Sequence, residues 1–307
     1  MLAAGADPNV RTTTEGCEDA IYMASQEGFD KVVALLLEAG ADPNSTVSDN
    51  GTSCLFMACH NGQDKVADLL LAAGADPTKL TTDDRTSPLF IACNNGHLEC
   101  ARLLLSRPLV DPNAAAAEDG ETPLVAAAYG DHHLVVRLLC EQGADPSLSS
   151  VDGATATVVC CEEGHARTLK VLLGFGAALE PPDDDLSEWT PLAAAAAGGH
   201  TACLELLLSG GALVDRVDPL QGESALLSAA AEGHCPAVKV LLAFGAAPDL
   251  KRRDGATPLR VAAERGATDC VRALLGGGRT RGDGRPTTAS RRRRRRGTTD
   301  TGSARTR

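Results

Sequence analysis

Histidine and cysteine are the residue types in this chain best suited to ligate a metal ion or to form a covalent bond. The chain has seven histidines, and five of them are spaced 33 to 35 residues apart: His97, His132, His165, His200 and His234. Zinc ligands usually come in close pairs. The wide spacing therefore favours hydrogen bonding in loops and between helices over metal binding.

The eleven cysteines include no Cys-x-x-Cys pair, which is the spacing typical of zinc and redox sites. Six of them fall at two small or apolar positions of a repeat described below, namely Cys59, Cys93, Cys161, Cys100, Cys203 and Cys270. Equivalent positions in neighbouring repeats would lie roughly 10 Å apart, too far for a disulfide. We therefore expect free, buried thiols and a reducing compartment.

The sequence contains no recognisable catalytic motif. A phosphate-binding Gly-Lys-Ser/Thr loop, a His-Glu-x-x-His zinc site and a Gly-x-Ser-x-Gly nucleophile turn are all missing. The run Gly174-Phe175-Gly176 falls in a turn between repeats, whereas a dinucleotide site would need a preceding strand. We predict a chain that is not an enzyme and that binds no cofactor and no metal.

The elements that would position any functional residue follow a repeat of 33 to 35 residues. Each repeat has an Ala-rich segment, a central glycine or its equivalent, and a Leu-rich segment. The central positions are Gly28, Gly62, Gly96, Asp131, Gly164, Gly199, Gly233 and Gly266. Glycine there permits the left-handed backbone that ends a helix, and aspartate tolerates it.

Each of the eight central positions is preceded, nine residues earlier, by a side chain that can cap a helix. These residues are Asp19, Ser53, Ser87, Thr122, Thr155, Thr190, Ser224 and Thr257. In four repeats the next residue is proline, which is favoured at the first position of a helix. The pattern predicts a short first helix, a turn at the central glycine and an apolar second helix that ends at Gly-Ala-Asp-Pro.

These residues resemble the ankyrin-repeat family. The family pattern Asp-Gly-x-Thr-Pro-Leu-His is matched at residues 119–124 and 254–259, although another residue replaces its histidine in all eight units. The resemblance covers roughly residues 1–276 and implies an all-α solenoid of helix-loop-helix units joined by β-hairpin fingers. Eight units would form an array on the order of 70 to 80 Å long.

We divide the chain into three parts. Residues 1–10 look like the end of a repeat whose beginning lies upstream, and residues 11–275 contain the eight repeats. Residues 276–307 hold eleven arginines and two aspartates but almost nothing apolar, so we expect a disordered tail. The net charge of −12 for the whole chain and +9 for the tail leaves −21 on residues 1–275.

The resemblance implies that partners bind the finger tips and the exposed end of the first helix. Across the repeats these positions hold twelve carboxylates and one basic residue, Arg265. Such a surface favours a protein partner with a basic segment, or simply keeps the array in solution. The candidate partner-binding residues are Trp189, Leu186, Tyr129, His60, Asn61, Asn94, Asn95, Glu118, Glu121, Glu162 and Glu163. Trp189, the only tryptophan, is the best candidate anchor because tryptophan is enriched in binding hot spots.

Location and the partner class remain open between alternatives. The acidic body argues against nucleic-acid binding except through Arg291 to Arg296, which could instead direct nuclear import or fold back on the body. Neither a signal peptide nor a membrane span is visible, so we expect a cytoplasmic or alternatively a nuclear protein. The favoured function is a non-catalytic interaction scaffold. The alternatives are a substrate-recruiting adaptor of a ligase or kinase assembly and a nuclear regulator.

Overall fold

The computed structural model describes residues 5–12, 18–46, 50–116, 119–180 and 190–277. Within these ranges the chain forms sixteen helices, in which short first helices alternate with apolar second helices. They are α1 (Ala20–Glu27), α2 (Asp30–Glu38), α3 (Cys54–His60), α4 (Asp64–Ala72), α5 (Pro88–Asn94), α6 (Leu98–Leu105), α7 (Pro123–Tyr129), α8 (His133–Glu141), α9 (Ala156–Glu162), α10 (Ala166–Gly174), α11 (Pro191–Ala197), α12 (Thr201–Gly210), α13 (Ala225–Ala231), α14 (Cys235–Ala243), α15 (Pro258–Glu264) and α16 (Thr268–Gly277).

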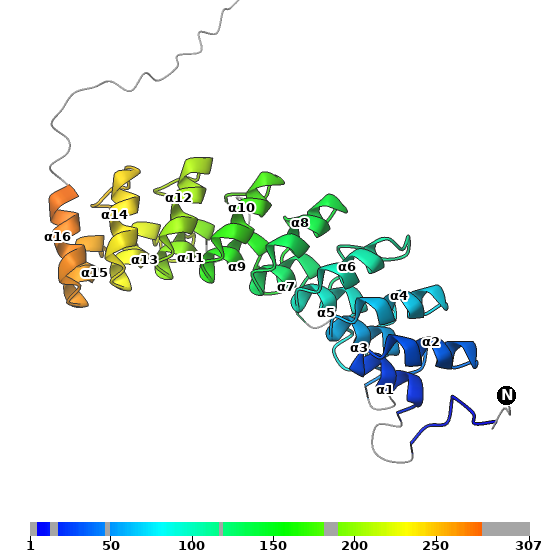
Figure 1. The fold of residues 1–307 in the computed structure, drawn as a ribbon. Helices are drawn as coiled ribbons and strands as arrows, with labels where there is room; N and C mark the ends of the chain where they lie inside the picture. Colours follow the sequence, from blue (N-terminus) through cyan, green and yellow to red (C-terminus); the bar gives the residue numbers. More distant parts are fainter. Residues whose placement is uncertain (1–4, 13–17, 47–49, 117–118, 181–189, 278–307) are drawn as a thin grey trace, which may run out of the picture.

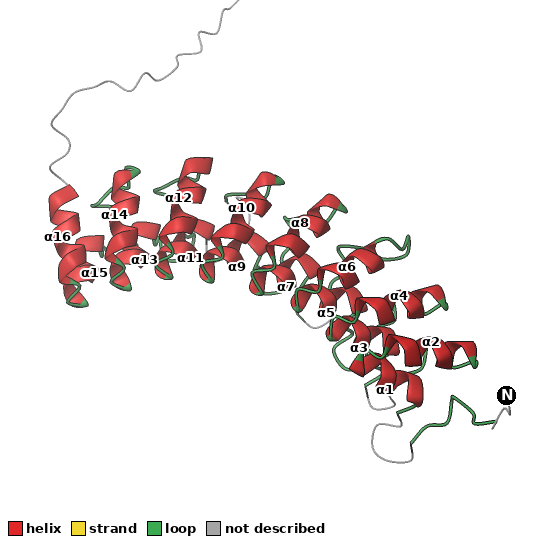
Figure 2. Ribbon diagram, in the orientation of Figure 1, coloured by secondary structure: helices red, strands yellow, loops and turns green. Residues whose placement is uncertain are grey.

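The helices lie in two rows that follow one arc. The odd-numbered helices form the inner, concave row, and the even-numbered helices form the outer row (Figure 1). Each helix packs against the other member of its pair and against the same-row helices of the adjacent repeats. The described part of the chain consists of helices and loops (Figure 2). The predicted all-α solenoid is therefore confirmed.

All eight predicted helix caps are present in the structure. In each repeat the side chain accepts a hydrogen bond from the backbone N–H three residues later, as Ser87 Oγ does from Phe90 at 3.0 Å. This bond satisfies one of the N–H groups that have no partner inside the helix. Each first helix therefore begins directly after its capping residue. The caps place the first helices of all eight repeats in the same register along the concave side.

The predicted left-handed residues end the first helix of every repeat. Gly96, for example, has φ 75°, and the N–H of the following His97 donates to the carbonyl of Ala92 at 2.8 Å. Asp131, which stands where the other repeats have glycine, adopts φ 55°. The chain thus leaves the first helix in one direction in all eight repeats.

Small and medium side chains fill one continuous core that runs along the array. The six cysteines placed at core positions are at most 1% exposed, and all ten cysteines of the described residues are free. Cysteines at equivalent positions are not the ones that approach each other. Cys59 of α3 and Cys100 of α6, at non-equivalent positions of adjacent repeats, lie within hydrogen-bond reach of each other.

The expected β-hairpin fingers are shorter than the resemblance implies. Among the described residues, three isolated antiparallel bridges are formed and no strand: Thr46 with Ser53, Ser149 with Thr155 and Val217 with Ser224. A finger that turns after one paired residue cannot extend a ladder. Neighbouring fingers are nevertheless joined by backbone bonds, as when the Val151 N–H donates to the Asp119 carbonyl at 2.8 Å.

Candidate functional site

The recurring histidines set the positions of the residues at the concave end of the first helices. Four of them bond through Nε2 to the preceding repeat: His97 to the carbonyl of His60 (3.0 Å), His132 to Asn94 (3.0 Å), His165 to Tyr129 (3.0 Å) and His200 to Glu162 (2.7 Å). The prediction of interhelical hydrogen bonding is confirmed for these four. The same four carbonyls belong to predicted partner-binding residues, so the bonds hold those residues in a row.

The predicted asparagines are part of the same connection between repeats. Asn61 Nδ2 donates to the carbonyl of Gln26 at 3.0 Å, and Asn95 Nδ2 donates to that of His60 at 2.9 Å. Asn94 Nδ2 in turn donates to Asn95 Oδ1 at 3.1 Å. The side-chain amides of Asn61 and Asn95 are thus used to connect neighbouring repeats. They are therefore less available for hydrogen bonds to a partner.

Several carboxylates at the centre of the array lie near enough to an exposed tyrosine for their charges to act on its hydroxyl. Tyr129, the last residue of α7, is 42% exposed. Burial raises the pKa of its hydroxyl, and four surrounding carboxylates raise it further: Glu121, Glu162, Glu163 and Asp152. We call these five residues the Tyr129 patch. Residues from α7, α9 and two adjacent fingers meet there.

The electrostatics of the Tyr129 patch favour a positive charge. Partial burial, followed by the charge of Asp119, raises the pKa of Glu121 above its usual value. Partial burial, followed by the charge of Glu163, does the same for Glu162. Burial is the main cause of both shifts, and repulsion from a neighbouring carboxylate adds to it. In the part of the chain that the structure describes, no Lys or Arg forms an ion pair with a carboxylate of the patch.

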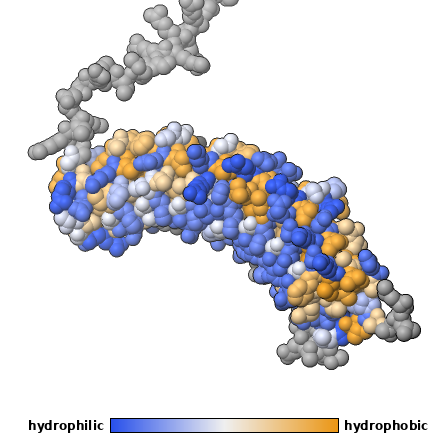
Figure 3. Space-filling model, viewed as in Figure 1, coloured by the Kyte–Doolittle hydropathy of each residue, from blue (hydrophilic) through white to orange (hydrophobic). Residues whose placement is uncertain are grey.

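Acidic residues near the end of the array behave differently. Arg252 lies 3.6 Å from Glu223 and 2.7 Å from Asp254, and Arg260 lies 2.8 Å from Glu264. The predicted acidic surface is therefore uneven: its negative charge is partly neutralised in the last two repeats and uncompensated around Tyr129. The concave edge is mostly hydrophilic in Figure 3.

The contact between two fingers holds one side of the patch. Val151 is 75% exposed, and one of its methyl groups lies near Gly120, where an added Cβ would approach it to 3.2 Å. Glu121 follows directly after that glycine. The exposed Val151 thus lies beside the finger that carries Glu121, and Asp152 is its neighbour in the sequence. Apolar and acidic side chains together suit an amphipathic basic segment.

Three predicted residues lie outside the described residues: Trp189, Leu186 and Glu118. The structure brings Glu121, Tyr129, Glu162 and Glu163 together, and places His60, Asn61, Asn94 and Asn95 along the same row toward α3 and α5. The Arg-rich run from Arg291 to Arg296 also lies outside the described residues.

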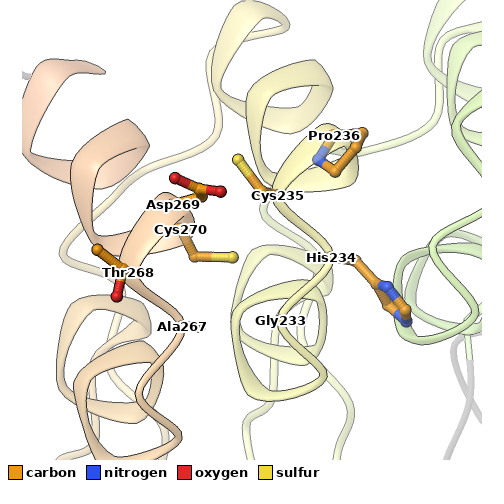
Figure 4. Close-up of a pocket in the computed structure, with 8 residues that line it drawn as sticks. All are labelled: Gly233, His234, Cys235, Pro236, Ala267, Thr268, Asp269 and Cys270. Atoms are coloured by element: carbon orange, nitrogen blue, oxygen red, sulfur yellow. The ribbon is translucent and has the colours of Figure 1, made fainter.

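Cys235 and Cys270 line an open pocket of about 280 Å³ between the last two repeats, within hydrogen-bond reach of each other (Figure 4). The ring of His234 points away from both thiols (Figure 4). Among the described residues, no group of three or more His, Cys, Asp or Glu side chains could hold a metal ion. Burial raises the pKa of the Cys54 thiol to about 12 and that of Cys203 to about 11, so these thiols stay protonated at neutral pH.

A family model of ankyrin repeats matches residues 1–81, 77–150, 142–218 and 211–283. The chain belongs to the ankyrin-repeat family. Ankyrin repeats bind protein partners, so the array is a protein-interaction fold. No helix among the described residues of this ankyrin array is long and apolar enough to cross a membrane.

Several curated proteins share part of this ankyrin sequence. Ankyrin repeat domain-containing protein 63 of Homo sapiens is 33% identical over 176 residues, which are 56% of this chain and 37% of that protein. The probable E3 ubiquitin-protein ligase XBOS32 of Oryza sativa subsp. japonica is 31% identical over 154 residues, 50% of this chain and 30% of that protein. E3 ubiquitin-protein ligase XBAT33 of Arabidopsis thaliana is 32% identical over 155 residues, 50% of this chain and 28% of that protein. The chain spans less than two fifths of the length of these relatives.

Proposed function

We propose that this ankyrin array is a non-catalytic scaffold or adaptor that binds a protein partner on its concave face. The partner's basic segment docks on the Tyr129 patch. The observation that supports this proposal is an exposed tyrosine whose hydroxyl feels four carboxylates, none of which forms an ion pair within the described residues. The binding of a cation there relieves repulsion that is already present in the free protein.

Two interactions favour arginine or lysine in the partner. A guanidinium or ammonium group over the face of an exposed tyrosine is worth about 0.5–1 kcal/mol. Each exposed ion pair adds roughly 0.2–1 kcal/mol. Because each contribution is small, we expect useful affinity only from several basic residues together, with a strong dependence on salt.

A second candidate function is the recruitment of substrates to a larger enzyme complex. It is favoured by the similarity to two E3 ubiquitin-protein ligases, each of which is much longer than the matched region. The array would then recognise the substrate, and another polypeptide or domain would carry out the catalysis. We keep two proposals for the location. The protein is a cytoplasmic scaffold, or it is a nuclear regulator that Arg291 to Arg296 direct to the nucleus.

The proposal is tested with a chain that ends at Gly277 and a fluorescent peptide of residues 289–298 as the basic probe. Anisotropy titrations at two salt concentrations compare the parent with Tyr129→Ala and with Glu162→Gln/Glu163→Gln. The matched control is Glu141→Gln/Glu205→Gln, which removes the same charge from exposed positions of the outer row.

We expect salt-sensitive binding that Tyr129→Ala weakens roughly two- to fivefold, which corresponds to about 0.5–1 kcal/mol. Glu162→Gln/Glu163→Gln removes two ion pairs and should weaken binding by roughly two- to thirtyfold. The outer-row control should leave the dissociation constant within about twofold of the parent value, apart from a general charge effect. Equal weakening by the patch and control variants would refute docking on the patch. It would mean that net charge alone attracts the peptide.

A further inference from the structure

Two cysteines meet at the boundary between the last two described repeats. Cys235 is the first residue of α14, and Cys270 is the third residue of α16. These two helices pack against each other. At the corresponding two positions of the other adjacent repeats at most one residue is a cysteine, as in the pair of Asp64 with Cys100. Within the described repeats, a pair of thiols at these positions therefore occurs at this boundary alone.

The two thiols share one open pocket. Cys235 and Cys270 both line the space of about 280 Å³ between the repeats, together with residues such as Thr268 and Asp269. Figure 4 shows their side chains projecting from the two helices into this space. The two sulfur atoms lie within hydrogen-bond reach of each other. Two free thiols that meet across neighbouring helices are the arrangement from which a disulfide forms.

Access to solvent distinguishes this pair from the cysteines that meet inside the core. Cys59 and Cys100 are 0% and 1% exposed, so a dissolved reagent cannot reach either sulfur in the folded protein. Cys235, by contrast, is partly exposed. Cys270 is only 1% exposed, but it lies beside Cys235 in the open pocket. Because thiol–disulfide exchange requires access to the attacking sulfur, the reaction can begin at Cys235 and continue at Cys270.

The neighbours of Cys270 differ from those of the equivalent cysteine in the interior. Cys100 meets Cys59, which lies three positions before the central glycine of the preceding repeat. The residue equivalent to Cys59 in the repeat before Cys270 is Ala230. Cys270 therefore has no thiol to meet in that first helix, and the sulfur within its reach is that of Cys235.

We propose that Cys235 and Cys270 form a reversible thiol–disulfide exchange site for small disulfides of the glutathione class, and that its oxidation joins the last two described repeats covalently. In a reducing compartment the pair is a dithiol. A rise in the ratio of oxidised to reduced glutathione converts it to the disulfide, and a fall in that ratio opens it again.

The exchange takes place in two steps. The Cys235 thiolate attacks one sulfur of oxidised glutathione, which breaks the glutathione disulfide, forms a mixed disulfide on Cys235 and releases one glutathione thiolate. The Cys270 thiolate then attacks Cys235 Sγ and releases the second glutathione thiolate. The two protons lost by the cysteines end on the two released glutathiones. The second step is intramolecular, so the mixed disulfide should be short-lived.

The disulfide would stabilise the last described repeat. The second helix of that repeat, α16, packs against α15 and α14, whereas an interior second helix such as α12 packs against outer-row helices on both sides. Helices with fewer packed neighbours open more easily. A bond from Cys235 to Cys270 closes a ring of residues 235–270 and restricts that opening.

The test uses the full chain with Cys17→Ser, because Cys17 lies outside the described residues. The protein is equilibrated with graded ratios of oxidised to reduced glutathione, and the remaining thiols are then blocked by alkylation. Mass spectrometry of tryptic peptides measures the disulfide between peptides 217–239 and 266–272 and the mixed disulfide on Cys235. The variants are Cys235→Ser and Cys270→Ser, and the matched control is Cys140→Ser, which removes another partly exposed thiol from the outer row.

We expect the cross-linked peptides to exceed the mixed disulfide by about tenfold or more in the parent and in Cys140→Ser. Cys270→Ser should instead accumulate the mixed disulfide on Cys235, and Cys235→Ser should form neither product. Hydrogen exchange of the α16 amides should slow about tenfold on oxidation of the parent, whereas exchange of the α4 amides should not change. Circular dichroism of each variant checks that its helix content equals that of the parent.

Several results would overturn the proposal. A mixed disulfide that persists on Cys235 in the parent would mean that Cys270 cannot reach it. Oxidation of Cys59 or Cys100 at the same rate as Cys235 would mean that the reaction needs an opened chain and has no specific site. A cross-link between two chains would show that Cys235 reacts with another molecule. A cross-link within one chain that leaves α16 exchange unchanged would refute stabilisation of the last repeat.

Discussion

Asp131 is the one central position among the eight repeats that is not glycine, and its partner Thr168 explains how it is tolerated. Thr168 is fully buried in α10, and its hydroxyl donates to Asp131 Oδ1 at 2.7 Å. Where the preceding repeat has glycine at its centre, an apolar residue or cysteine stands at the position of Thr168; Val135, for example, follows the repeat whose centre is Gly96. We predict that Thr168→Val destabilises the array and that adding Asp131→Gly restores it.

The expected size follows from the groups involved. A hydrogen bond to a carboxylate contributes about 1.5–3 kcal/mol, and the lower end applies because Asp131 is only partly buried. The methyl group that replaces the hydroxyl returns about 0.8 kcal/mol by burial. Thr168→Val should therefore lose about 1 kcal/mol, which lowers the midpoint of thermal unfolding by roughly 2–4 °C in a protein of this size.

The double variant separates the pair from general damage to the core. Glycine at 131 removes both the carboxylate and the left-handed strain of a non-glycine residue, about 1–2 kcal/mol at most. The double variant should thus match or exceed the parent, giving a coupling free energy near 1 kcal/mol or above in urea unfolding. Additive losses, or no effect of Thr168→Val alone, would refute the reasoning.

Two further predictions concern the residues that hold and form the concave face. Gly96→Ala should lower the free energy of unfolding by about 1–2 kcal/mol because of the left-handed backbone, and by about 1 kcal/mol more because the His132 ring must shift. Gly74→Ala should lose only the backbone contribution, since no atom lies within 4 Å of the added Cβ. Urea midpoints of the two variants test this, and equal losses would contradict it. Partial burial and the charge of Glu163 raise the pKa of Glu162 in the folded protein, so the ionised Glu162 side chain destabilises the fold. This destabilisation is absent below the pKa of an ordinary carboxyl group and complete above the raised pKa of Glu162. Glu162→Gln should therefore slightly raise the melting temperature at pH 7 and leave it unchanged at pH 4; a change of the same size at both pH values would contradict this.

The helices could be predicted from the sequence because each boundary depends on a local rule. A capping side chain such as Ser87 acts on an N–H three residues away, and a central glycine such as Gly96 acts on its own backbone. Neither rule needs to know what packs against the helix. Even the exception, Asp131, was predictable because aspartate tolerates the left-handed conformation.

Contacts between non-equivalent positions could not be predicted in the same way. The contact between Cys59 and Cys100 depends on how the second helix of one repeat packs against the first helix of the repeat before it. The repeat length in the sequence does not determine that packing. The pairing of Arg252 with both Glu223 and Asp254 likewise depends on finger geometry, so a count of charges overstated the acidity of the last repeats.

The Tyr129 patch illustrates why the partner is harder to infer than the fold. The stacking of repeats constrains the buried positions, and the bond from His165 constrains only the carbonyl of Tyr129, not its side chain. The side chains that point into the concave space are free to differ from repeat to repeat, as His60, Asn94, Tyr129 and Glu162 do at one equivalent position. Binding specificity therefore lies in the departures from the repeat. One such departure is Tyr129, the only Tyr, Trp or Phe at that position, whose hydroxyl feels the charge of four carboxylates that form no ion pair within the described residues.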